Sequence, residues 1–93
     1  MNKEQKEVWD ALRYDMHVAE NGTKFWFLNG ELHREDGPAI EYADGDKSWY
    51  LNGDLHREDG PAVEYADGTV YWYLSGKEYS EKKFNKELAT RNG

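Results

Sequence analysis

Two histidines that stand beside pairs of carboxylates are the residues of this chain best suited to chemistry. The two groups are His33 with Glu35 and Asp36, and His56 with Glu58 and Asp59. Imidazole and carboxylate groups act as metal ligands and as general acids and bases. Because a metal or catalytic site needs side chains that converge, the alternative is a structural role for each histidine.

The residues that face these histidines favour the structural role. A two-residue turn at Asn52-Gly53 puts His56 opposite Trp49 in a hairpin. One repeat later, Tyr79 falls opposite Trp72 in the same way. A position that accepts either His or Tyr suits a flat side chain with a polar tip, and does not suit a metal ligand. We therefore expect the imidazoles to pack or to form hydrogen bonds, and we predict no metal site.

No other pattern in the sequence indicates catalysis. There is no glycine-rich phosphate loop and no zinc-binding spacing, and the chain contains no cysteine. Ser48, Ser75 and Ser80 lie in strand, turn and helix-cap contexts, without the neighbours that activate a nucleophile. We predict that the protein is not an enzyme and that it uses no cofactor.

A repeated segment must position these residues. Residues 29–39 return nearly unchanged as residues 52–62, an offset of 23 residues, and a third, shorter copy begins at residue 75. Runs of β-branched and aromatic residues between Asn-Gly and Asp-Gly pairs predict strands joined by tight turns. The predicted fold is therefore mainly β, an antiparallel meander of β-hairpins with a 23-residue period.

Short helices are expected at both ends of this meander. Val8, Trp9 and Leu12 have helical spacing, and Ser80 precedes a run with Phe84 and Leu88 four residues apart. We assign a single domain over residues 1–93, with a helix at 2–13, β-hairpins at 14–79 and a helix at 80–91.

The register of the hairpins predicts which side chains share a face. If Asp44-Gly45 is a two-residue turn, Ile40 lies opposite Trp49, and a similar turn at Asn21-Gly22 pairs Met16 with Phe27. We expect the face that carries the tryptophans to form the main core. The other face is also apolar near the N-terminus, so the N-terminal helix or a second subunit is expected to cover it.

Two surfaces are candidates for binding. The first is a ridge of mixed charge on two identical loops, formed by Arg34, Glu35, Asp36, Arg57, Glu58 and Asp59. The alternative for this ridge is a set of exposed ion pairs with no binding role. The second is an aromatic face formed by Tyr50, Tyr71 and Tyr73, beside Glu41 and Glu64. The alternative for this face is burial under the terminal helices.

The charge of the chain limits its partners. There are 19 Asp and Glu against 12 Lys and Arg, and the net charge is −7. Nucleic acids and anionic membranes both reward positive charge, so we predict neither as a direct partner. The balance suits a protein partner with a basic surface, with a homodimer as a further possibility. No signal-type or membrane-spanning segment is apparent, so the expected location is the cytoplasm.

The repeat resembles the MORN repeat (membrane occupation and recognition nexus). The matching pieces are Trp-Tyr-Leu-Asn-Gly-Asp-Leu-His at residues 49–56 and Tyr-Ala-Asp-Gly at residues 65–68, within a resemblance that covers residues 21–79. The chain departs from that pattern because residues 34–38 and 57–61 replace the glycines that follow the histidine. The chain is also similar to small phage and bacterial proteins with tandem His-Arg-x-Asp-Gly-Pro-Ala repeats. The resemblance implies successive hairpins in an elongated sheet and binding to proteins, sometimes to acidic lipids.

Three functions follow as expectations. The first is an acidic protein-binding module, concretely a phage-encoded inhibitor that blocks a host defence complex of the CRISPR type or another nucleic-acid-binding complex in the host cytoplasm. The second is a sponge for a small nucleotide-like ligand, held by the repeated Trp, His and Arg side chains. The third is a structural or assembly component.

Overall fold

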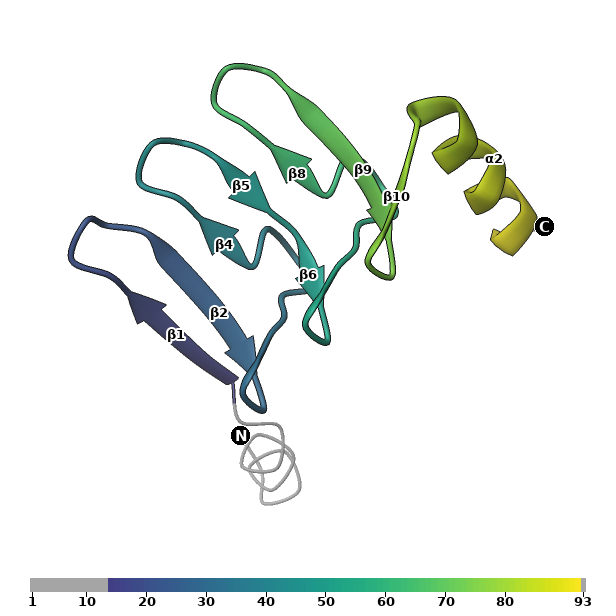
Figure 1. Ribbon diagram of the computed structural model, residues 1–93. Helices are drawn as coiled ribbons and strands as arrows, with labels where there is room; N and C mark the ends of the chain where they lie inside the picture. Colours follow the sequence, from purple (N-terminus) through teal and green to yellow (C-terminus); the bar gives the residue numbers. More distant parts are fainter. Residues whose placement is uncertain (1–13, 93) are drawn as a thin grey trace.

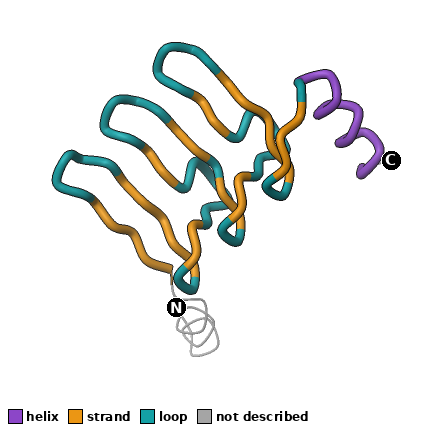
Figure 2. Tube along the Cα trace, viewed as in Figure 1, coloured by secondary structure: helices purple, strands orange, loops and turns teal. Residues whose placement is uncertain are grey.

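Antiparallel strands followed by one helix make up the part of the chain, residues 14–92, that the computed structural model describes (Figures 1 and 2). The strands are β1 (Tyr14–Val18), β2 (Lys24–Leu28), β3 (Glu31–Leu32), β4 (Ile40–Glu41), β5 (Lys47–Ser48), β6 (Tyr50–Leu51), β7 (Asp54–Leu55), β8 (Val63–Glu64), β9 (Val70–Leu74) and β10 (Lys77–Tyr79), and the helix is α2 (Glu81–Asn92). The predictions of a mainly β, meander-like antiparallel fold and of a C-terminal helix are confirmed. The predicted helix at 2–13 lies outside the described residues.

Most strands join one sheet in the order β1-β2-β4-β5-β8-β9-β10, in which β3 pairs with β2, while β6 and β7 form a two-stranded ladder of their own. Figure 1 shows the hairpins side by side along the sheet, with α2 beyond the last one. The structure measures 45 × 39 × 19 Å, so the sheet is thin and has two large faces.

The turns at one end of the hairpins are the two-residue turns expected from the sequence. Asn29 and Gly30 have φ of 52° and 85°, and Asn52 and Gly53 have φ of 53° and 84°. A type I′ turn needs positive φ at both central residues, which Asn and Gly adopt at little cost. Trp49 therefore lies opposite His56, whose N–H donates to the Trp49 carbonyl at 3.0 Å.

The turns at the other end are one residue longer than expected. The Tyr42 N–H donates to the Asp46 carbonyl at 2.9 Å, and the Gly45 N–H donates to the Tyr42 carbonyl at 3.0 Å. Gly45 has φ of 100°, and the Asp44 carboxylate accepts the Asp46 N–H at 3.0 Å. These bonds close a three-residue loop with glycine in the left-handed position, so the predicted two-residue turns there are wrong.

One extra residue in a turn moves the partner strand by one position and changes which side chains share a face. Ile40 lies opposite Ser48, and Met16 lies opposite Trp26. The predicted pairs Ile40–Trp49 and Met16–Phe27 are therefore wrong. Ile40 belongs to the face opposite the tryptophans.

Five apolar residues form the fully buried core of the described chain. Ala39, Ile40, Ala62, Leu74 and Phe84 are each at most 5% exposed. Trp26, Trp49 and Trp72 are themselves half-buried. The face that carries them nevertheless holds most of the buried residues, as expected, because the Trp26 and Trp49 N–H groups bond the Ala39 and Ala62 carbonyls, and Leu74 and Phe84 lie beside Trp72. We call the side of the sheet that carries the three tryptophans the tryptophan face.

Helix α2 closes the end of the tryptophan face. The Lys83 N–H donates to the Ser80 hydroxyl at 3.2 Å, which confirms the predicted helix cap. Phe84 is 1% exposed, and its ring centre lies 4.8 Å from that of Trp72. The helix is thereby anchored on β9 and β10 beside the last tryptophan.

Candidate functional site

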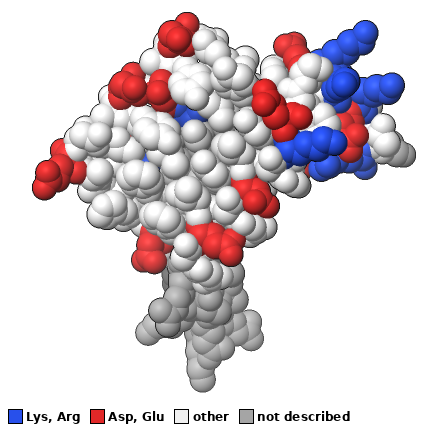
Figure 3. Space-filling view, in the orientation of Figure 1, with Lys and Arg blue, Asp and Glu red and all other residues white. Residues whose placement is uncertain are grey.

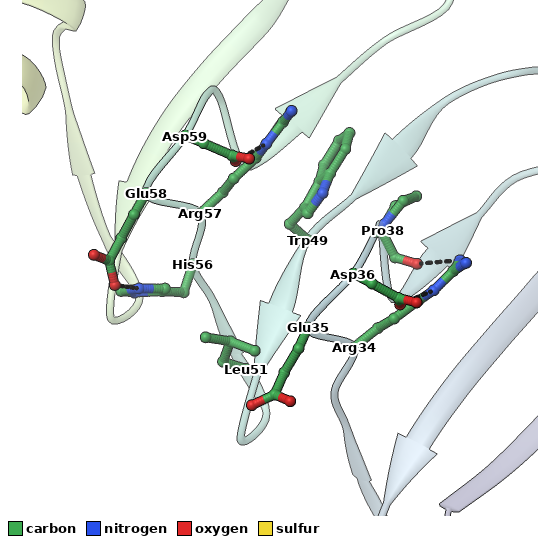
Figure 4. Close-up of a pocket in the computed structure, with 11 residues that line it drawn as sticks. Arg34, Glu35, Asp36, Pro38, Trp49, Leu51, His56, Arg57, Glu58 and Asp59 are labelled. Carbon is green, nitrogen blue, oxygen red and sulfur yellow. Dashed lines mark hydrogen bonds and ion pairs between the residues drawn. The ribbon is translucent and has the colours of Figure 1, made fainter.

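An arginine holds each loop of the predicted ridge in place (Figure 4). In the second loop, Arg57 Nε donates to Asp59 at 2.8 Å, and Nη1 donates to the Pro61 carbonyl at 3.1 Å and to Glu64 at 2.8 Å. The guanidinium carbon lies 3.9 Å from the centre of the Trp49 ring. We call this set of contacts the arginine clamp; it ties one loop to a strand and to an aromatic ring.

The first loop carries the same clamp. Arg34 donates to Asp36 at 3.1 Å, to the Pro38 carbonyl at 3.1 Å and to Glu41 at 2.9 Å, and its guanidinium carbon lies 3.9 Å above Trp26. The Arg34 and Arg57 side chains are 24% and 20% exposed. Both arginines are therefore occupied within the fold. The sequence patterns identified them as ridge residues but missed their stacking on tryptophan.

The clamp also explains the glycine in each Asp-Gly-Pro segment. A Cβ atom on Gly60 would lie 2.8 Å from Arg57 Cζ, and one on Gly37 would lie 3.0 Å from Arg34 Cζ. Neither Gly37 nor Gly60 has a positive φ, so the backbone conformation does not require glycine at these positions. The close approach of the guanidinium explains why glycine is present.

The histidines link one hairpin to the next. His33 Nδ1 accepts the Asn52 N–H at 2.9 Å, and His56 Nδ1 accepts the Ser75 N–H at 2.8 Å. An imidazole that accepts at Nδ1 carries its proton at Nε2, which in His56 lies 2.9 Å from Glu58. The expected hydrogen-bonding role is confirmed. Within residues 14–92, no three His, Asp or Glu side chains are grouped so as to hold a metal ion.

All six predicted ridge residues line one groove of about 650 Å³ between the two loops. Trp49 and Leu51 also line this groove, and Figure 4 shows them between the loops. The carboxylate side chains are far more exposed than the arginines, at 75% for Glu35, 88% for Asp36, 57% for Glu58 and 87% for Asp59. The expected ridge of mixed charge is thus acidic at its surface; we call it the acidic ridge.

The clamp also favours the ionised form of one ridge carboxylate. The hydrogen bond from Arg57 is the main cause that lowers the pKa of Asp59 below its ordinary value. This carboxylate therefore stays ionised at neutral pH and in mildly acidic solution.

The predicted aromatic face is a second groove, of about 510 Å³, on the other side of the sheet. Tyr50, Tyr71 and Tyr73 line it as predicted, together with two tyrosines that the register error had hidden, Tyr42 and Tyr65. The other lining residues are Asp46, Ser48, Leu55 and Val63. We call it the tyrosine groove.

Two expectations about the tyrosine groove are wrong. Glu41 and Glu64 were placed beside the tyrosines, but they bind Arg34 and Arg57 on the tryptophan face. The alternative of burial under the terminal helices is wrong for the C-terminal helix, because Phe84 of α2 packs against Trp72 on the other face; the predicted N-terminal helix lies outside the described residues.

Charge is unevenly distributed along the chain. Residues 14–79 contain fourteen acidic and five basic side chains, whereas α2 contains two acidic and four basic ones. Figure 3 shows a broad surface over the strands with few charges, acidic side chains around its border and basic ones gathered over α2. Across the described residues, no helix has the length and apolar character needed to span a membrane.

Comparison of the chain with protein-family models, with curated proteins and with solved structures finds no match.

Proposed function

We propose that this protein is an acidic binding module that docks on a basic surface of another protein through its acidic ridge. The observation that carries the proposal is the exposure of four carboxylates around one groove, while the neighbouring arginines are held inside the fold. A surface of one sign of charge attracts a partner of the other sign and speeds their encounter.

The fixed geometry of the ridge favours a specific partner. In each loop the arginine makes two hydrogen bonds within the loop and one to a strand glutamate, so the clamped carboxylates Asp36 and Asp59 lose little conformational freedom on binding. The second loop has the same bonds as the first at positions 23 residues later, in keeping with a repeat of the MORN-like type. Carboxylates repeated along a rigid sheet have the charge pattern that a nucleic-acid-binding groove accepts.

The concrete form of the proposal is an inhibitor, encoded by a phage, that blocks a host defence complex such as a CRISPR-type effector. It would act in the host cytoplasm by covering the basic surface that receives nucleic acid. Its support is physical: the strand-bearing part of the chain carries nearly three acidic side chains for each basic one.

The nucleotide-sponge alternative receives less support from the site. A nucleotide ligand needs free cationic donors for its phosphates, whereas Arg34 and Arg57 already bind carboxylates and carbonyl groups within the fold. The exposed carboxylates of the groove would repel the phosphates. No contact in the described residues favours a structural or assembly role over binding.

The test is capture of a partner from an extract of the native host, followed by elution with salt and with double-stranded DNA. The proposal predicts a specific protein that is released by moderate salt and displaced by DNA, because both compete for its basic surface. Retention of the partner that neither salt nor DNA reduces would refute the proposed docking on a basic surface.

A further inference from the structure

The tyrosine groove lies on the face opposite the acidic ridge, and the proposed function does not use it. Tyr42, Tyr65 and Tyr71 are 41%, 44% and 40% exposed, although large aromatic side chains on a soluble surface are usually better covered. Aromatic side chains exposed together in a groove are typical of a contact site.

The rings do not lie flat against one another. Tyr65 and Tyr71 meet edge to face, with ring centres 5.9 Å apart and an angle of 88° between their planes. The plane of one ring is therefore perpendicular to the plane of the other. Grooves lined by aromatic rings receive proline-rich segments in several recognition modules.

The spacing of the tyrosines across the strands matches an extended proline-rich chain. Ser48 on β5 pairs with Val63 on β8, which pairs with Tyr71 on β9, so residues 23 positions apart in the chain lie on either side of one intervening strand, and Tyr50 and Tyr73 have this separation. Tyr50 and Tyr73 are thus two strands apart, which corresponds to about 9.5 Å. One turn of polyproline II helix advances by about 9.3 Å.

A partner can contact the tyrosine groove only through side chains, because the backbone groups of its strands are already paired within the sheet. β8 pairs with β5 on one side and with β9 on the other, so strand addition at this place is excluded. Burial raises the pKa of Tyr50 and of Tyr73. Their hydroxyls keep the proton and are available to donate, and a polyproline II backbone has carbonyls without internal partners.

The acidic residues around the tyrosine groove favour a foreign partner over a second copy of the chain. Asp46 lines the groove, Glu78 lies opposite Tyr73, and residues 14–79 carry an excess of nine acidic side chains. Two copies face to face would bring these acidic borders together at an unfavourable cost. A segment with lysine or arginine beside its prolines is complementary to them.

We propose that the tyrosine groove binds a proline-rich segment of a partner protein, in polyproline II conformation, running across the strands with a basic residue at its flank. This is the recognition mode in which aromatic rings receive the preformed proline helix. It is independent of the acidic ridge, because the two surfaces lie on opposite faces.

The test is a binding titration of the full chain with a labelled synthetic peptide that has prolines in a polyproline II pattern and two terminal arginines, followed by fluorescence anisotropy. The comparison peptide keeps the arginines and replaces the prolines with alanine. The variants are Tyr71→Ala and, as a matched control on the other side of the same strand, Val70→Ala, since both side chains are about 40% exposed.

The expected result is saturable binding of the proline peptide that weakens at least about tenfold in Tyr71→Ala, is unchanged in Val70→Ala, and is at least about tenfold weaker for the alanine peptide. Equal binding of the two peptides would mean general attraction of basic chains and would overturn the proposal. Absence of saturable binding, or a dimer of the free protein that Tyr71→Ala dissociates, would overturn it as well.

Discussion

The guanidinium carbon of Arg57 lies 3.9 Å from the centre of the Trp49 ring, and the same side chain bonds a loop carboxylate, a backbone carbonyl and a strand carboxylate. One residue thereby fixes the loop that presents Glu58 and Asp59. The Arg34 contacts with Trp26 repeat this arrangement. The shape of the acidic ridge depends on these two arginines.

Replacement of Arg57 by lysine is expected to destabilise the fold although it keeps the charge. A lysine cannot make the forked hydrogen bonds, and it stacks less well on tryptophan. We expect Arg57→Lys to lower the free energy of unfolding by about 1–3 kcal/mol in urea denaturation. The control is Lys47→Arg, at an exposed strand position, which is expected to have little effect. A loss of stability no larger than that of the control would contradict the clamp.

A methyl group on Gly60 is expected to disturb the clamp directly. Its Cβ would lie 2.8 Å from Arg57 Cζ, so Gly60→Ala should cost about 1–3 kcal/mol of unfolding free energy. In an Arg57→Ala background the clash is absent, and the same substitution should be nearly neutral. A double-mutant cycle by thermal or urea unfolding measures this coupling. Additive effects would show that the guanidinium is not what requires glycine.

His33 is expected to stabilise the link between successive hairpins. Its side chain is buried, at 8% exposure, and it accepts the Asn52 N–H. His33→Ala removes the acceptor and leaves a cavity, so we expect a loss of about 2–4 kcal/mol. His17→Ala, at an exposed position on β1, is the matched control and should cost much less. Equal effects in the two variants would argue against the hydrogen-bond link.

Acid is expected to weaken the fold in part through Asp59. Its pKa is lowered in the folded state, mainly by the Arg57 hydrogen bond, so the unfolded chain takes up the proton first as the pH falls. The contribution of Asp59 is therefore present above the ordinary carboxyl pKa and is lost as the pH falls through the lowered value. The stability gap between wild type and Asp59→Asn should be largest near neutral pH and shrink in acid. A gap that stays constant with pH would contradict this assignment.

The sequence predicted the parts of the fold whose signals are local. Asn29-Gly30 and Asn52-Gly53 have the residues that a type I′ turn needs, and Ser80 has the hydroxyl that a helix start needs. The sequence also predicted the strands between these turns and the pairing of Trp49 with His56.

The parts of the fold that the sequence did not predict depend on one additional residue in each loop and on contacts between residues far apart in the sequence. Asp44-Gly45 fits both a two-residue turn and the end of a three-residue loop, and only the hydrogen bonds of Tyr42 distinguish them. The choice of the shorter turn shifted the faces and left Tyr42 and Tyr65 out of the tyrosine groove. The stacking of Arg57 on Trp49 joins residues on a loop and a strand, for which periodicity carries no signal.

The most direct test of the acidic ridge measures the affinity of the captured partner for charge-reversed variants. Glu35→Lys combined with Glu58→Lys changes the ridge, whereas Glu20→Lys changes an exposed acidic residue in the first turn, outside the ridge. We expect the double variant to raise Kd at least about a hundredfold at low salt, with the native fold retained, while Glu20→Lys stays within about threefold of wild type. Equal loss in both variants, or no loss in the double variant, would contradict the ridge as the binding surface.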